Sequence, residues 1–186
     1  MSIESTLSDA AARMGKAVEV AKDDFAAIRT GRAHASMFTK LQADYYGSPT
    51  PLQQLASFQV PEARVVLIQP YDVSSMASIE KAVRESDLGV NPSNDGKTIR
   101  ITMPELTADR RKEYAKLARV KAEEAKVSVR SVRRSAKDSI DKLSKDGEVG
   151  EDEANRAEKR LDGLTKQHAD QVEDLLRHKE AEILEV

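Results

Sequence analysis

The sequence KVSVRSVRRSAK, residues 126–137, decides the fold because it carries two helical patterns at once. Its apolar residues recur at helical spacing and predict a face that packs against partner helices; these residues are Val129, Val132 and Ala136. Its basic residues recur at the same spacing on a neighbouring face, within roughly 60° of arc. We call them the basic stripe: Lys126, Arg130, Arg133 and Lys137. The apolar face predicts a helical bundle, and the basic stripe predicts an anionic ligand.

Composition narrows the class of protein. Of 186 residues, 33% are charged and 4% are aromatic, which suits long exposed helices better than a thick globule. The formal charge is −2, so a nucleic-acid surface must be a local patch. The sequence has no Cys, which excludes disulfides and thiolate chemistry. It shows neither a signal peptide nor an apolar run of membrane-spanning length, so we expect a soluble cytoplasmic protein without a membrane partner.

Two further amphipathic segments predict the partner helices. Residues 3–28 carry apolar side chains at steps of three and four, close to a heptad pattern. The helix with the basic stripe covers residues 107–143, and a third helix covers residues 151–183. Ser2 and Thr107 are predicted N-caps. Gly31 is predicted to end the first helix in a left-handed conformation.

Residues 33–104 differ from both ends, because they hold all six prolines. Their patterns predict strands at 41–46 and 98–102, a hairpin of 57–60 with 64–68, and a helix at 74–86. The predicted fold class is therefore α+β. A long three-helix bundle is built from residues 1–30 and 106–186, with a small α/β domain of residues 31–105 inserted.

The two connections between these predicted domains are short and paired. They lie near 30–32 and 103–106, which predicts a hinge. The predicted hinge residues are Thr30, Gly31, Met103, Pro104 and Glu105.

No other motif indicates chemistry. The segment DGKT ends like a phosphate loop, but six residues separate Gly89 from Gly96 where the motif needs four, and a strand is predicted to follow. We predict a hairpin turn there. The three histidines are isolated from one another, and His168 is predicted to pack on the bundle seam. We predict no catalytic group, metal site, cofactor or small-molecule substrate, and no enzyme.

The basic stripe remains the best candidate site. It continues towards the N-terminus of its helix through Arg119, Lys116 and Lys112, interrupted by Glu123. Few acids on the same helix stand near enough to pair with most of it, which favours polyanion binding. The alternative is an ordinary solvated face whose cations pair with acids.

Five separated segments resemble signatures of the ribosome recycling factor family, in the same order along the chain. They are IRTGRA (28–33), YYGSPTPL (45–52), SDLGVNP (86–92), LTADRRKE (106–113) and VRSVRR (129–134). The resemblance covers essentially the whole chain. Two positions depart from it: Ser131 stands where Asn is common, and Ser135 where Asp is common.

The resemblance implies a monomeric, L-shaped, two-domain protein of transfer-RNA dimensions. It would act after termination with elongation factor G and its GTP hydrolysis to split ribosomes. The bundle would bind large-subunit ribosomal RNA, and the α/β domain would face elongation factor G. The expected ribosome-binding residues are Arg111, Lys126, Arg130, Arg133, Arg134, Lys137, Arg29 and Arg32. The alternative function is a helical adaptor or chaperone that binds protein partners.

Overall fold

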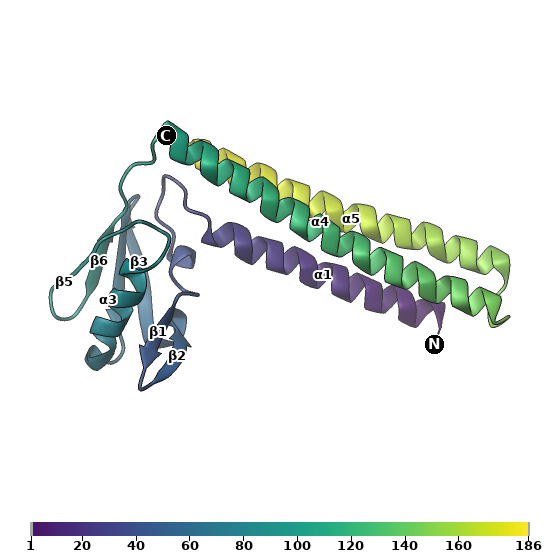
Figure 1. The fold of residues 1–186 in the computed structure, drawn as a ribbon, viewed down its shortest axis with the longest axis horizontal. Helices are drawn as coiled ribbons and strands as arrows, with labels where there is room; N and C mark the ends of the chain where they lie inside the picture. The colour runs from purple at the N-terminus through teal and green to yellow at the C-terminus, as the bar shows by residue number, and fades with distance from the viewer. Residues whose placement is uncertain (1, 186) are drawn as a thin grey trace. The chain divides into compact units, whose positions relative to one another are not determined.

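The computed structural model describes residues 2–185, with long helices near both ends of the chain and strands in its middle part (Figure 1). In chain order the elements are α1 (Ile3–Ala27), η1 (Ala35–Met37), β1 (Gln42–Tyr45), β2 (Ser48–Pro51), α2 (Leu52–Leu55), β3 (Ala56–Glu62), β4 (Val65–Pro70), η2 (Val73–Ser75), α3 (Met76–Arg84), β5 (Pro92–Asn94), β6 (Ile99–Thr102), α4 (Ala108–Lys145) and α5 (Glu151–Leu184). The chain divides into two compact units. The bundle unit contains the residues up to Phe25 and Lys116–Glu180, and the sheet unit contains Ala26–Ala115 and the residues from Ala181 on.

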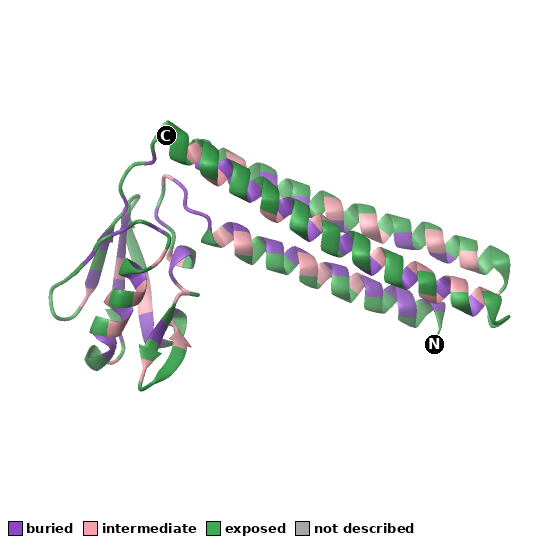
Figure 2. Ribbon diagram, viewed as in Figure 1, coloured by how far each residue is buried: buried purple, intermediate pink, exposed green. Residues whose placement is uncertain are grey.

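In the bundle unit, α1 and most of α4 and α5 lie side by side (Figure 1). They share one apolar core, in which Met14, Ile140 and Leu161 are almost completely buried. Figure 2 shows buried positions recurring along each of these helices, as the spacing of three and four predicts. Burial of one such side chain contributes roughly 1.5–3 kcal/mol. The core therefore fixes which face of α4 points outward, and the three predicted long helices are confirmed.

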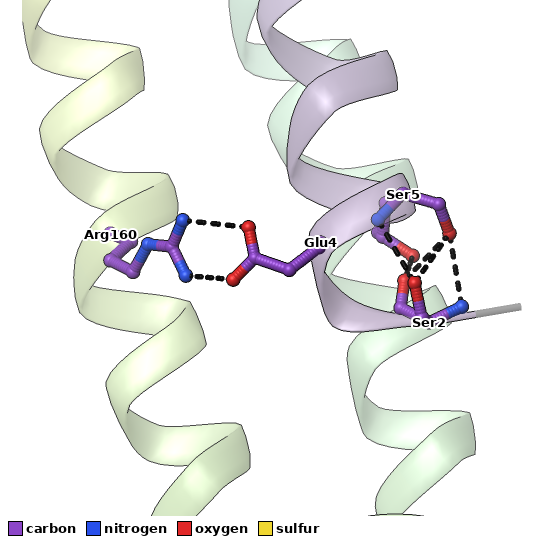
Figure 3. A network of polar contacts seen from close by, with 5 residues as sticks. Ser2, Glu4, Ser5 and Arg160 are labelled. Atoms are coloured by element: carbon purple, nitrogen blue, oxygen red, sulfur yellow. Dashed lines mark hydrogen bonds and ion pairs between the residues drawn. The ribbon is translucent and has the colours of Figure 1, made fainter.

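The two predicted N-caps are also confirmed. The Ser5 backbone N–H donates to Ser2 Oγ at 3.1 Å, and the Ser2 N–H donates back to Ser5 Oγ at 2.9 Å (Figure 3). At the start of α4, the Arg110 N–H donates to Thr107 Oγ1 at 3.2 Å. Each hydroxyl satisfies a backbone donor that the first helical turn leaves free.

The predicted left-handed conformation of Gly31 is wrong. α1 ends at Ala27, and Gly31 is not among the glycines with positive φ. A Cβ atom at Gly31 would lie 3.3 Å from the carbonyl oxygen of Glu185. A close backbone approach, and not backbone handedness, is therefore what favours glycine here.

The sheet unit is built on a four-stranded antiparallel sheet with the strand order β3-β4-β6-β5. β1 and β2 form a separate antiparallel hairpin. The predicted hairpin of 57–60 with 64–68 is confirmed as β3 and β4, and the predicted strand at 98–102 is confirmed as β6. The core between sheet and helix contains fully buried apolar side chains, including Phe38, Ile68, Ile79, Ile99 and Ile101.

Two strands were not predicted, and both contain proline. β2 includes Pro49 and Pro51 and pairs only with β1, and β5 begins at Pro92 on the edge of the sheet. Proline lacks a backbone N–H, so it is confined to edges where no ladder hydrogen bond is lost. Tyr46 and Gly47 form the turn between β1 and β2, because Tyr45 pairs with Ser48.

Candidate nucleic-acid interface

The basic stripe lies on the bundle unit, along the side of α4 that borders α5. Between Lys126 and Lys137 it extends for about 16 Å along the helix axis at 1.5 Å per residue. Arg130 is exposed, and the other three side chains are partly exposed. The core positions Val129 and Val132 hold α4 in place, so the stripe is presented on a rigid support.

Every cation of the stripe has a carboxylate partner. Arg133 donates to Asp162 Oδ1 through Nε at 2.8 Å and Nη2 at 2.7 Å. The other pairs are Lys126 Nζ with Glu173 at 2.5 Å, Lys137 Nζ with Glu158 at 3.1 Å, and Arg130 Nη2 with Glu123 at 2.8 Å. The stripe is thus a row of exposed ion pairs, most of them shared with α5.

The prediction that most of the stripe lacks acid partners on its own helix is wrong for three of its four cations. Glu123 lies 2.8 Å from Arg130 and 4.0 Å from Lys126, and Asp141 lies 3.6 Å from Lys137. Acids on α5 supply further partners. The hydrogen bond from Arg130 lowers the pKa of Glu123 below its usual value. The hydrogen bond to Glu158 likewise raises the pKa of Lys137. Both shifts favour the charged forms of Glu123 and Lys137.

Arg134 differs from the stripe. It is exposed on α4, and within residues 2–185 no carboxylate lies at ion-pair distance from it. It lies beside a shallow groove with Ser131 and Ser135, the two positions that depart from the family pattern. Among the predicted contacts on the bundle unit, Arg134 is the described cation that is free to meet an anion directly.

Arg111 lies in the sheet unit, in the first turns of α4. It is half-buried, and its Nε atom is buried without a hydrogen-bond partner. With Arg32 and Arg64 it lines a cavity of about 340 Å³. Arg32 is exposed and lies 3.9 Å from Glu185. Both predicted contacts, Arg111 and Arg32, can therefore reach an anion at the surface of the sheet unit.

Arg29 has different surroundings from those predicted. Its side chain is buried, with 7% of the residue exposed, and Nη1 donates to the Leu88 carbonyl at 3.2 Å. Nη2 donates to the Pro104 carbonyl. Because the guanidinium is used inside the sheet unit, this position does not support a direct contact with RNA. Arg29 is a structural arginine.

Two of the predicted hinge residues, Met103 and Glu105, contact the turn between β3 and β4. The Met103 N–H donates to the Arg64 carbonyl at 2.7 Å, and the Ala33 N–H donates to the Ala63 carbonyl at 2.7 Å. Glu105 pairs with Arg64 at 3.1 Å. Thr30 is buried and donates through Oγ1 to the carbonyl of Arg32, Gly31 lines the Arg111 cavity, and Pro104 accepts from Arg29. Whether these segments act as a hinge stays a prediction.

The remaining candidates are structural. Asp95 Oδ1 accepts the N–H groups of Lys97 and Thr98, which confirms the predicted hairpin turn. His168 is buried, and its Nδ1 lies 2.7 Å from the Leu164 carbonyl oxygen. Among residues 2–185 no group of acidic residues and histidines is arranged to hold a metal ion. Within that same range, no helix combines the length and apolar character that crossing a membrane requires.

The carboxylates of α5 are the important residues that the sequence argument missed. Their numbers fall as the stripe numbers rise, from Glu173 beside Lys126 to Glu158 beside Lys137. Antiparallel helices require this order. Aligning the apolar faces of α4 and α5 in an antiparallel register would have identified these carboxylates.

The family model described as ribosome recycling factor matches residues 21–184. Ribosome-recycling factors from Paenarthrobacter aurescens and Streptomyces coelicolor are each 64% identical over 184 residues, covering 99% of this chain and 100% of the relative.

Solved structures agree with the sequence comparison. A solution structure of the ribosome recycling factor matches with a TM-score of 0.79 and 40% identity, over 100% of this chain and 99% of that one. A second match has a TM-score of 0.71 and 38% identity, with 100% of both chains covered. It is described as models for the T. thermophilus ribosome recycling factor and the E. coli elongation factor G bound to the E. coli post-termination complex. The chain belongs to the ribosome recycling factor family.

Proposed function

We propose that this chain is a translation factor that splits post-termination ribosomes into subunits, together with elongation factor G and GTP hydrolysis by that partner. Its membership of the ribosome recycling factor family supports this function. So does its likeness to a recycling factor described together with elongation factor G on a post-termination complex. The ribosome and elongation factor G are therefore its proposed partners.

The bundle unit binds large-subunit ribosomal RNA through the basic stripe and Arg134. One observation carries this step: arginine and lysine groups stand in a row, exposed or partly exposed, on the side of core-packed α4 that borders α5. Arginine presents a planar fork of donors that matches a phosphate, and a packed helix keeps these forks in place before binding. Arg111 and Arg32 supply additional contacts from the sheet unit.

The inserted domain moves about the two connections when elongation factor G acts on it. The short segments 30–32 and 103–106 are the flexible points in this proposal. Small-angle scattering of the free protein and of a rigidly cross-linked form tests this part. Different profiles support the motion, and nearly identical profiles contradict it.

A sucrose-gradient assay tests the function directly. Post-termination ribosomes are incubated with the protein, with or without elongation factor G and GTP, and the subunits are separated. We expect free subunits only when protein, elongation factor G and GTP are all present. An adaptor or chaperone would instead give salt-insensitive association with protein partners and no release of subunits.

Binding of isolated large subunits tests the surface. The Arg133→Ala variant should bind more weakly and with a flatter salt dependence, because each lost phosphate contact reduces the log–log slope by roughly 0.7–0.9. Arg177→Ala is a matched control, because Arg177 is an exposed bundle arginine that pairs at 2.8 Å with Asp174 on its own helix and not with a residue of the stripe. Equal binding by both variants and the original protein would remove the stripe from the proposal.

A further inference from the structure

The basic stripe is already occupied by anions from its own chain. Asp162, Glu158 and Glu173 of α5 contact Arg133, Lys137 and Lys126 respectively, at 2.7, 3.1 and 2.5 Å. A ribosomal RNA phosphate that binds one of these cations must meet the group that a carboxylate now holds. Binding through the stripe is therefore an exchange of one oxyanion for another.

We propose that the α5 carboxylates Glu158, Asp162 and Glu173 are built-in competitors of ribosomal RNA phosphates, which limit the affinity of the basic stripe and promote its release. This inference rests on the proposed function of the stripe. It assigns a role to residues that contribute no positive charge. It also explains how a row of cations can bind RNA and still dissociate from it at the end of each recycling reaction.

The exchange is feasible because the pairs are exposed. The side chain of Asp162 is 53% exposed and that of Glu173 is 49% exposed, so water can solvate both when the cations turn away. Exposed ion pairs of this kind contribute little to folding stability. A phosphate also offers several acceptor oxygens to an arginine fork, so it can replace a single carboxylate oxygen on Arg133.

The carboxylates also change how binding responds to salt. A cation that neutralises a phosphate releases the counterions of that phosphate. When a carboxylate remains beside the new contact, the local charge stays negative and the RNA retains more of its cations. Removing the carboxylate should therefore raise the affinity and steepen the salt dependence together.

Arg134 provides an internal reference on the same helix. Within the described part of the chain it has no carboxylate partner, so its contact with a phosphate involves no exchange. Neutralising the α5 acids should leave the contribution of Arg134 unchanged, and it should increase the contribution of Arg133. The comparison of these two arginines separates competition from a general change in charge.

The experiment measures binding of the full-length protein to isolated large subunits over a range of salt concentrations. The test variants are Asp162→Asn and the triple variant Glu158→Gln, Asp162→Asn and Glu173→Gln. The matched control is Glu4→Gln, which removes the same unit of charge and also breaks a pair between helices. Glu4 accepts two hydrogen bonds from Arg160 at 2.5 and 3.0 Å, and Figure 3 shows this pair joining α1 to α5.

We expect Asp162→Asn to bind about two- to fivefold more tightly, because an exposed pair of this kind has a small free energy to overcome. The triple variant should bind roughly tenfold more tightly or more and dissociate more slowly. Its salt slope should be steeper by up to about 0.7–0.9 for each carboxylate removed. Glu4→Gln should bind like the original protein.

Two outcomes overturn the proposal. Weaker binding by Asp162→Asn would mean that the carboxylate holds Arg133 in the binding conformation and does not compete. Binding equal to that of Glu4→Gln would mean that the acids have no part in recognition. Failure of the proposed function is distinguishable, because in that case Arg133→Ala would also bind like the original protein.

Discussion

Arg29 and Arg133 were both expected to contact ribosomal RNA, and the structure gives them opposite surroundings. Arg29 is buried in the sheet unit, where it donates to the main-chain carbonyls of Leu88 and Pro104. Arg133 lies on the surface of the bundle unit, where it donates to the exposed carboxylate of Asp162. The partners of an arginine, more than its charge, therefore decide what it can do.

The two arginines differ in how easily their present hydrogen-bond partners can be replaced by an anion. The Leu88 carbonyl is buried and has no water to replace a lost donor, so the contact that Arg29 makes there is costly to break. An exposed carboxylate that loses its arginine is solvated at once, so the contacts of Arg133 can be traded for a phosphate. The hydrogen bonds of Arg29 therefore stabilise the sheet unit, whereas those of Arg133 lie on the surface of the bundle unit.

Arg29→Ala should produce the largest effect. We expect the free energy of unfolding of the sheet unit to fall by about 2–4 kcal/mol, because two carbonyls lose a charged donor. Tyrosine fluorescence reports on this unit alone, because all four tyrosines lie within Ala26–Ala115 and the chain has no Trp. Urea titration followed by this signal measures the change.

Arg32→Ala is the control for that experiment. Arg32 is exposed, and its pair with Glu185 is long at 3.9 Å, so we expect a change below about 1 kcal/mol. If the free energy of unfolding fell equally in both variants, burial would not explain the difference between the two arginines.

Arg133→Ala should change binding far more than folding. We expect large-subunit binding to weaken by about tenfold, because a charge-assisted hydrogen-bonded contact is worth on the order of 1.5 kcal/mol. The free energy of unfolding, measured by urea titration and far-UV circular dichroism, should fall by less than about 1 kcal/mol. A variant that is strongly destabilised but binds large subunits normally would show that Arg133 has a structural role like that of Arg29.

Glu4→Gln should produce the smallest change in the free energy of unfolding, and this change should be present only above acidic pH. The hydrogen bond and the charge of Arg160 lower the pKa of Glu4 from its usual 4.5. A carboxylate with a lowered pKa in the folded state stabilises above its unfolded pKa and loses that contribution as the pH falls. The stability gap between the original protein and the variant should therefore be present at pH 7 and close below about pH 4.5.

Urea titrations between pH 7 and pH 3 measure this gap. A gap that stayed constant across the range would show that the Glu4–Arg160 pair does not act through its charge. That result would also weaken the use of Glu4→Gln as a matched control for the acids of α5.

The sequence alone predicted the long helices well, but it did not predict which side chains pair between them. The apolar steps of three and four at residues 3–28 are local, and the core confirms them with Met14 at 0% exposure. The pairing of Arg133 with Asp162 depends on the register between two helices, which a pattern within one helix does not contain. Charge spacing therefore identified the basic stripe and missed the α5 carboxylates that pair with it.

Two other differences have the same origin. Arg29 looks like a surface cation in sequence, and only the paths of the chain at Leu88 and Pro104 bury it. Pro92 looks like a strand breaker, and the edge position of β5 makes it acceptable. Contacts between distant segments decided each case, and local patterns could not predict them.

Binding of ribosomal RNA by the basic stripe is tested most directly by the salt dependence of large-subunit binding for the double variant Arg130→Ala and Arg133→Ala. We expect weaker binding and a log–log slope reduced by roughly 1.4–1.8 relative to the original protein, because two phosphate contacts are lost. Equal affinity and parallel salt lines would contradict this expectation, because the basic stripe would then not touch ribosomal RNA.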